Sequence, residues 1–435
     1  MISILHISDL HFTIDGAGSQ FDRDLKIREA LLADLGRDER KDLAAIVVTG
    51  DITYHGRAAE FARAKAWLED VRKAAGVAPE GIFVVPGNHD VNQEVVTKAS
   101  SLWDLHQGLR AQAPREDRLL SLQKKLQDPF DFLMAMIEYR AFATEYGCST
   151  NTKEVAWVET LGDEHLLEDG TAVRIHGLNS ALISDQEDKK ANLLLGDFQF
   201  QHFNADPDVV SLVLCHHPHP WLLDGNEAND YFRNQTHVVL CGHDHSPRCY
   251  KEGGSLRLFA GAIHPNRRET DWEPCYHVLR LSVETVPART LRVRVTTRTW
   301  RPKDKCFGPY AQPDGKLYHE ELVSLPAWPG RKTPQAAITV SSPVGATVAA
   351  KPTKDEFQAA RRKLIVHFFR LGTIARYQAA ISAGVWDDAD DALDLQARWT
   401  RVFERAEQLE KLAALWAAIA AQDKTLSGQP NPFTP

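Results

Sequence analysis

Residues 2–11, ISILHISDLH, form a short, mostly apolar run that leads directly into an Asp-Leu-His cluster, and this arrangement recurs through the first 245 residues. Short β-branched runs of this kind are typical of strands in a sheet that helices cover on both faces. Five polar clusters follow such runs: Asp9-Leu10-His11, Gly50-Asp51, Gly87-Asn88-His89-Asp90, His216-His217-Pro218 and Gly242-His243-Asp244-His245. The sequence therefore predicts buried strands that end in polar loops.

Helical patterns separate the first three apolar runs, at residues 25–35 and 58–75. Strands that alternate with helices in this way predict an α/β core with parallel strands. The polar clusters then stand at the carboxyl ends of the strands, where open α/β sheets bind their ligands. We expect the functional site at this edge.

The rest of the chain divides by composition and periodicity. Leucine and aromatic residues spaced three or four apart predict a helical insertion at about 91–166, and the alternation over residues 291–296 predicts closing antiparallel strands. A Pro-, Thr- and Ser-rich stretch without periodicity predicts a linker. The expected units are a catalytic domain over 1–325, the linker over 326–354, a helical bundle over 355–425 and a tail over 426–435.

The side chains of the five clusters are those of a metal site. Imidazole, carboxylate and amide donors suit Mn²⁺, Fe²⁺, Zn²⁺ or Ni²⁺ better than Mg²⁺ or Ca²⁺, which prefer all-oxygen shells. Phosphoryl transfer at a two-metal site needs cations about 3.5–4 Å apart, each with several ligands. We therefore expect two divalent transition metal ions, with manganese as the first candidate.

Taken together and in this order, the clusters resemble the signature motifs of the calcineurin-like metallophosphoesterase superfamily. The resemblance covers about the first 300 residues and implies a four-layer α-β-β-α sandwich. It implies that Asp9, His11 and His245 hold one metal, and that Asn88, His216 and His243 hold the other. Asp51 would bridge both ions.

The same resemblance implies roles in catalysis. His89 matches the histidine that protonates the leaving oxygen or stabilises phosphoryl charge while a metal-bridging hydroxide attacks, and Asp90 is a candidate to orient it. Asn88, His217 and Asn179 are candidates for substrate contact. For His217 the alternative is a supporting role behind the ligands, and for Asn179 it is a turn at a strand end.

These expectations favour a phosphodiesterase that acts on a nucleotide or on a small or single-stranded nucleic acid. The net charge of −8 gives no general attraction to a long duplex. The alternatives are a metal-dependent DNase or RNase, and an effector enzyme that a partner switches through the C-terminal bundle. Five arginines are candidates for a phosphate-binding patch or for a solvent-exposed strand face: Arg267, Arg268, Arg292, Arg294 and Arg298.

The C-terminal bundle more loosely resembles the effector-associated and death-like adaptor domains that accompany enzymes in bacterial conflict systems. The segments RYQAAISAGVWDD (376–388) and FERAEQLEKLAALWAAI (403–419) carry the likeness. It implies a protein partner for this domain and is compatible with an oligomer.

Bulk properties set the expected compartment. Hydrophobic residues make up 43% of the chain and charged residues 25%, which is an ordinary globular composition. No apolar run approaches the roughly 18 residues that a membrane span needs, and the N-terminus lacks the features of a signal peptide. Because the six cysteines are scattered without CxxC spacing, we expect a reducing, cytoplasmic setting and no membrane partner.

Overall fold

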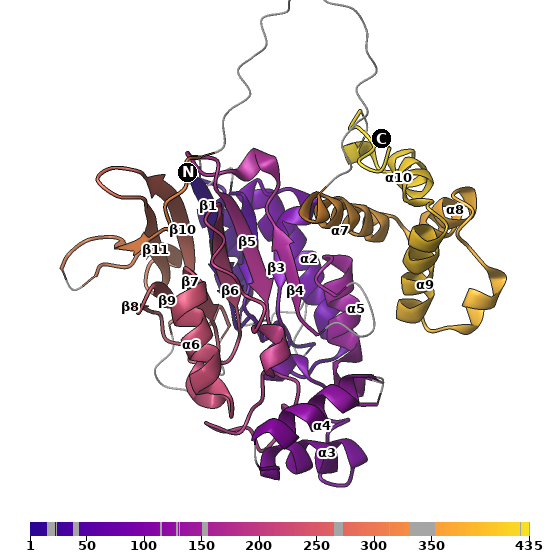
Figure 1. The fold of residues 1–435 in the computed structure, drawn as a ribbon, viewed down its shortest axis with the longest axis horizontal. Coiled ribbons are helices and arrows are strands. Elements are labelled where there is room, and N and C mark those ends of the chain that lie inside the picture. Colours follow the sequence, from indigo (N-terminus) through magenta and orange to yellow (C-terminus); the bar gives the residue numbers. More distant parts are fainter. Residues whose placement is uncertain are drawn as a thin grey trace, which may run out of the picture.

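The computed structural model forms two β-sheets flanked by helices, with further helices at the C-terminal end (Figure 1). It describes residues 1–435 except 15–21, 23, 38–42, 114, 128, 130, 150–154, 265–272, 313, 331–352, 427 and 435. The predicted residues Arg267 and Arg268, and most of the predicted linker, lie outside the described residues.

The first sheet begins with the three parallel strands that the apolar runs predicted. These are β1 (Ile2–Ile7), β2 (Ala45–Val48) and β3 (Ile82–Val84), joined by α1 (Leu25–Leu35) and α2 (Ala58–Ala75). Antiparallel strands extend it beyond β1, namely β10 (Cys275–Glu284), β11 (Thr290–Arg301), β12 (Cys306–Pro309) and β13 (His319–Ser324). The described order is β12-β11-β10-β1-β2-β3, with β13 also paired to β11.

The second sheet contains the remaining apolar runs. Its strands are β4 (Trp157–Thr160), β5 (Ala172–Gly177), β6 (Val209–Leu214), β7 (Val238–Cys241), β8 (Arg248–Glu252) and β9 (Ser255–Phe259). In the order β4-β5-β6-β7-β9-β8, the four central strands are parallel and the two edge strands are antiparallel to their neighbours. Helix α6 (Gly225–Gln235) connects β6 to β7.

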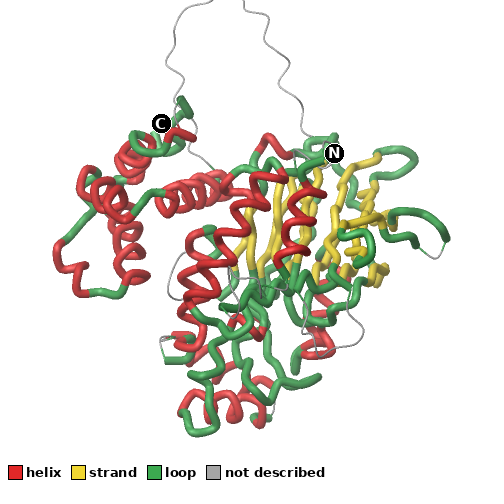
Figure 2. The backbone as a smooth tube through the Cα atoms, turned by 180° about the vertical axis from the view of Figure 1, so that it is seen from behind, coloured by secondary structure: helices red, strands yellow, loops and turns green. Residues whose placement is uncertain are grey.

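One hydrophobic core joins the two sheets. It contains fully buried side chains from both, such as Leu5 and Val47 of the first sheet and Leu212 and Leu240 of the second. Helix α6 lies in front of the strands in Figure 1, and the reverse view in Figure 2 shows helices across the opposite side. The predicted four-layer α-β-β-α sandwich is therefore confirmed.

The predicted insertion contains α3 (Ser101–Ala111), α4 (Arg115–Gln127) and α5 (Ile137–Glu145). Its helical part is shorter than the predicted interval of 91–166, because β4 already belongs to the second sheet. Trp157 of β4 stacks on Phe83 of β3, with ring centroids 5.7 Å apart. A strand of four residues is too short to show the two-residue periodicity that would have distinguished β4 from the helical insertion in the sequence.

Four helices follow at the C-terminal end: α7 (Lys354–Arg370), α8 (Thr373–Ser382), α9 (Leu395–Gln408) and α10 (Leu412–Ala420). They enclose a second core around Phe368, Trp399 and Leu415. The predicted tail belongs to this bundle, since Phe433 lies against the rings of Phe357 and Trp416.

Helix α7 connects the bundle to the rest of the molecule, because it also contacts α5 and β4 (Figure 1). Throughout the described part of the chain, every helix is too short or too polar to cross a membrane.

Candidate metal centre

The five polar loops converge at the carboxyl ends of strands from both sheets. Backbone hydrogen bonds tie them together: the Asp9 amide donates to Gly50, and the His11 amide donates to Asp51. The Gly242 amide in turn donates to the carbonyl of His216. Residues from the two ends of a 245-residue stretch thus lie in one site. This is the arrangement predicted from the position of each cluster at the carboxyl end of a strand.

The candidate ligands form two groups in which the ligand atoms lie within 4.8 Å of one another. One group is Asp9, His11, Asp51 and His245, and the other is His216, His217 and His243. Oδ2 of Asp51 lies 3.3 Å from Nε2 of His11 and also 3.3 Å from Nε2 of His216. Asp51 therefore lies between the two groups, and the bridging role that the family resemblance implies for it is geometrically possible.

Backbone carbonyls fix the protonation of two of these histidines. Nδ1 of His11 lies 2.7 Å from the carbonyl oxygen of His264, and Nδ1 of His216 lies 2.7 Å from that of Thr49. Because a carbonyl can only accept, Nδ1 must carry the proton, and Nε2 of the neutral ring keeps its lone pair for a ligand. This second partner is typical of histidines that bind metals.

Nε2 of each ring lies 3.3 Å from the carboxylate of Asp51, a position that suits either a proton on the ring or a metal ion in its place. Nε2 of His216 is buried and has no hydrogen-bond partner among the described residues. Burial opposes a charge on His216, but the Asp51 carboxylate outweighs it and raises the pKa of His216 to about 9. The pocket thus favours positive charge, and its donors fit divalent cations.

The carboxylates remain charged despite their burial. Burial alone would raise the pKa of Asp9, but the hydrogen bond and charge of His245 outweigh it and lower the pKa to about 2. The pKa of Asp51 is likewise held well below its usual value, because the imidazoles of His216, His89 and His11 outweigh burial. Both carboxylates are therefore ionised at neutral pH, as candidate metal ligands need to be.

The ligand residues have strained backbones. Of the eight non-glycine residues with positive φ in the described chain, five belong to the predicted ligand set: Asp9, His11, Asp51, His243 and His245, with φ from 43° to 70°. The left-handed region is unfavourable for residues with a Cβ and persists where the surrounding structure imposes it, often at functional sites. The strain points to the same residues as the motif spacing.

Glycines in the motifs leave room for the ligands. A Cβ on Gly87 would lie 2.2 Å from Oδ1 of Asp51, and a Cβ on Gly242 would lie 2.8 Å from Oδ2 of Asp9. Any side chain at these positions would displace a candidate ligand. The glycine in each motif is thus a steric requirement of the site.

His89 lies at the partly exposed rim of the first group. Its Nδ1 lies 2.9 Å from the carbonyl oxygen of Tyr54, and its amide donates to Oδ1 of Asp51 at 2.8 Å. The rings of His89 and His11 are 4.9 Å apart. The carbonyl fixes the proton on Nδ1 and so orients the ring, which leaves Nε2 as the atom for chemistry.

Asp90 does not orient His89 and is corrected to a structural role. Its carboxylate accepts hydrogen bonds from the amides of Ile52, Thr53 and Gly87, and from the hydroxyl of Thr53. Burial and the charge of Asp51 raise the pKa of Asp90 to about 7. Asp90 ties the loop of Asp51 to the loop of Asn88, and the carbonyl of Tyr54, not the carboxylate of Asp90, orients the ring of His89.

The three candidates for substrate contact differ in burial and in hydrogen-bond partners. His217 is only 1% exposed, and its Nε2 lies 3.1 Å from Oδ1 of Asn88, which favours the supporting role. Asn88 itself is half-buried at the rim of the site. Asn179 is buried, and its Oδ1 accepts from the amide of Ala181 within a turn. The turn interpretation therefore describes Asn179, while its neighbour Ser180 contacts Nδ1 of His217 at 2.9 Å.

Sequence reasoning missed two aromatic residues at the site. Trp221 lies edge-on to His243, with ring centroids 4.1 Å apart, and Tyr54 lies 5.0 Å from the ring of His89. Their positions shortly after ligand motifs were the available signal. The backbone of His264, which accepts from Nδ1 of His11, carries no sequence signal at all.

The described candidates for a phosphate-binding arginine patch are engaged elsewhere. Arg292 pairs with Glu284 and Glu320, and Arg294 also pairs with Glu320. Arg298 is buried and binds both oxygens of Asp34. These three side chains stabilise the closing strands.

Comparison with known structures finds proteins that share parts of this architecture at low identity. Vps29 from Chaetomium thermophilum is 11% identical, with 75% of this chain and 100% of that chain covered and a TM-score of 0.30. Zinc-complexed Vps29 from Entamoeba histolytica is 12% identical, with coverage of 74% and 98% and a TM-score of 0.29. The purple acid phosphatase PPD1 from yellow lupin is 9% identical, with coverage of 74% and 53% and a TM-score of 0.38.

No curated protein matches the chain closely. The model of one protein family, described as calcineurin-like phosphoesterase, matches residues 2–247. The matched span is more than half of the chain, and it begins in β1 and ends just after His245, so it contains every predicted ligand. The chain therefore belongs to the calcineurin-like phosphoesterase family.

Proposed function

We propose that this protein hydrolyses phosphodiesters of a nucleotide or of a short single-stranded nucleic acid, with two divalent transition metal ions, manganese first among them. Family membership supports a phosphoesterase activity in general. The observation that carries the two-metal proposal is the position of Asp51, whose carboxylate lies 3.3 Å from an Nε2 atom of each ligand group. That geometry calls for cations on both sides of one carboxylate.

Bound cations would lower the pKa of a shared water and offset the charge of the phosphoryl oxygens. The protein's own groups do the rest. Asp9 and Asp51 supply anionic oxygens, and the carbonyls of His264 and Thr49 hold two histidine ligands in one tautomer. His89, fixed through Tyr54, would hydrogen-bond the phosphoryl group or pass a proton to the leaving oxygen.

A small substrate fits the charges better than a duplex does. The net charge is −8, and Arg292, Arg294 and Arg298 are all paired with carboxylates. A polyanionic duplex would need unpaired cations along its path. The six cysteines, all within the described chain, are free thiols, which supports a cytoplasmic setting.

The test is hydrolysis by metal-depleted protein to which Mn²⁺ is returned. The substrates are bis(p-nitrophenyl) phosphate, cyclic and linear nucleotides, single-stranded DNA, RNA and a phosphomonoester. Asp51→Asn and His89→Ala are the inactive variants, and His219→Ala is the matched control, since this half-buried histidine lies in neither ligand group.

We expect Mn²⁺-dependent turnover of small diesters, which both inactive variants lose and His219→Ala keeps. Cleavage of polymers alone would instead identify a nuclease. Protein that binds Mn²⁺ but hydrolyses no phosphodiester would contradict the proposal.

A further inference from the structure

The outer edge of β3 is covered by side chains from distant parts of the chain. Among the described residues β3 ends the first sheet, with β2 on its one paired side. On the open side, the carbonyl of Val84 accepts from Nε1 of Trp157 at 3.0 Å and from the hydroxyl of Tyr139 at 3.3 Å. The carbonyl of Ile82 accepts from Arg362 of helix α7 at 2.6 Å. A helix that follows the linker thus completes the polar bonding of a strand in the catalytic domain.

Arg362 occupies a slot shaped for it. Its side chain is 5% exposed, its guanidinium donates to the carbonyls of Glu80 and Ile82, and it lies 4.1 Å from the ring centroid of Phe83. Gly147, at the end of the insertion, has a φ of +68°, and a Cβ there would lie 2.5 Å from Cγ of Arg362. A planar fork that binds two carbonyls and stacks on a ring is specific to arginine.

The strand that Arg362 holds leads directly to the metal centre. After β3 the chain passes through Val85 and Pro86 to the loop of Asn88 and His89. The amide of His89 donates to Asp51, and Asp90 fastens the same loop to the amides after Asp51. Because β3 runs directly into this loop, a displacement of β3 relative to β2 would act on the bonds that hold the Asn88 loop against the Asp51 loop.

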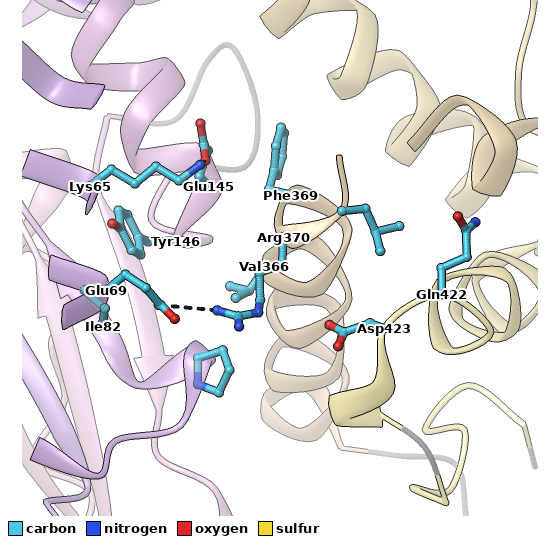
Figure 3. A pocket seen from close by; sticks show the side chains of 12 residues that line it. Lys65, Glu69, Ile82, Glu145, Tyr146, Val366, Phe369, Arg370, Gln422 and Asp423 are labelled. Atoms are coloured by element: carbon cyan, nitrogen blue, oxygen red, sulfur yellow. Dashed lines mark hydrogen bonds and ion pairs between the residues drawn. The ribbon is translucent and has the colours of Figure 1, made fainter. Parts of the chain in front are cut away.

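Part of the α7 contact is looser, as Figure 3 shows. A cavity of about 350 Å³ lies between α7 and the catalytic domain, lined by Tyr146 on one side and by Val366 and Phe369 on the other. Across it, Arg370 reaches Glu69 in a single ion pair at 3.4 Å. At its other end α7 is held by an ion pair between Asp355 and Arg174 at 3.0 Å, so the looser part of the contact is the C-terminal end of α7 beside the cavity.

We propose that Arg362 is a positioning residue for the metal centre, through which the C-terminal bundle controls the Asn88 loop. The inference rests on the proposed function only for its effect on turnover. Its effect on metal binding is independent of which substrate the protein hydrolyses. A partner that binds the bundle and draws α7 away from β3 would lower both.

The experiment compares full-length wild type with Arg362→Ala, Arg362→Lys and the matched control Arg370→Ala. Three quantities are measured for each protein. Calorimetry gives the Mn²⁺ affinity, hydrolysis of bis(p-nitrophenyl) phosphate gives kcat and KM, and mass spectrometry or NMR gives the rate of amide hydrogen exchange over residues 85–91. Lysine keeps the charge but cannot bind both carbonyls, so it serves as the milder variant if alanine prevents folding.

Both Arg362 variants should weaken Mn²⁺ binding at one site, by about tenfold for alanine, and lower kcat more than they raise KM. Exchange over 85–91 should rise, while Arg370→Ala leaves all three measurements unchanged. A folded Arg362 variant that matches wild type in Mn²⁺ affinity and exchange overturns the inference, whether or not the diester is hydrolysed. If the wild type binds Mn²⁺ but hydrolyses no diester, the proposed function fails while this result still decides the role of Arg362.

Discussion

The metal loops and the C-terminal bundle bury their side chains for different reasons. At the metal loops, Asp9, Asp51 and His216 are at most 1% exposed, and five ligand residues have left-handed backbones. The core of the bundle is a cluster of apolar residues such as Phe368 and Leu415. Buried charge and backbone strain are costly unless something compensates them, whereas apolar burial stabilises by itself. Buried charge and strain at the metal loops therefore indicate a bound ligand, whereas apolar burial in the bundle indicates only a stable fold.

The largest effect should come from Asp51→Asn. The change removes the charge that faces both ligand groups, so we expect fewer than two Mn²⁺ per chain by calorimetry. Turnover should fall by more than about 100-fold, since even outer partners of metal ligands cost 10- to 100-fold. Two bound ions and wild-type turnover in this variant would mean that Asp51 is buried for structural reasons alone.

His89→Ala should separate chemistry from metal binding. The imidazole belongs to the rim, and its Nδ1 is committed to Tyr54. We expect kcat to fall by about 100- to 10,000-fold, the range for loss of a proton-transferring group, with Mn²⁺ stoichiometry unchanged. A loss of bound metal would instead place His89 among the ligands.

Trp399→Ala tests the bundle as a separate core. Trp399 is 2% exposed and packs against Phe368, with ring centroids 5.2 Å apart. Truncation should cost about 3–5 kcal/mol of bundle stability. In urea we expect two unfolding transitions, because the two cores are distinct clusters. Mn²⁺ should stabilise the transition of the catalytic domain, and Trp399→Ala should shift only the other transition, that of the bundle. A single shifted transition would show that the two regions unfold as one.

Acid should weaken the contact between the two regions. Burial opposes ionisation of Glu80, but the nearby imidazole of His367, 3.7 Å away, and the charge of Lys363 outweigh it and lower the pKa of Glu80 to about 2. A carboxyl with a lowered folded-state pKa stabilises fully above its unfolded pKa, here 4.5, and loses this contribution as pH falls toward 2. The contribution is on the order of 2–3 kcal/mol. Thermal unfolding from pH 6 to pH 2 should show a smaller decline in Glu80→Gln than in wild type, and parallel declines would contradict this.

The smallest effect should come from Thr353→Ala. The Thr353 hydroxyl caps α7 by accepting from the amide of Glu356, whose carboxylate in turn accepts from the Thr353 amide. Loss of such a cap costs about 1 kcal/mol. Urea unfolding should show that cost in the bundle transition, with Thr373→Ala at the start of α8 as a control that removes an exposed hydroxyl. Equal costs in the two variants would mean that the cap does not stabilise α7.

The sequence predicts most of the fold because strand and helix periodicities are local. The convergence of the candidate ligands is predictable as well, since each of them follows an apolar strand and parallel strands bring their carboxyl ends together. The errors concern contacts whose partners are backbone atoms. Asp90 binds amides, Tyr54 orients His89 through its carbonyl, and Asn179 closes its own turn. Residue type alone does not reveal such partners.

The attachment of α7 was equally hidden, because an arginine within a helical stripe reads as a solvated residue. Only the folded chain brings Arg362 to Phe83 and Gly147. The predicted boundary at residue 326 therefore marks a change in composition. The packing of the catalytic domain extends beyond it, because α7 contacts α5 and β4.

The covered edge of β3 has a practical consequence for expression of the catalytic domain. Protein cut before Lys354 would lack Arg362 and would leave the outer edge of β3 less protected, with Phe83 uncovered on one side. Open strand edges pair with other chains, so such a protein should aggregate on concentration. Ending the domain after Leu371 would keep the edge closed but would uncover Leu364 and Phe368, which pack in the core of the bundle, so the chain that keeps the whole bundle is the more tractable sample for crystallisation with substrate.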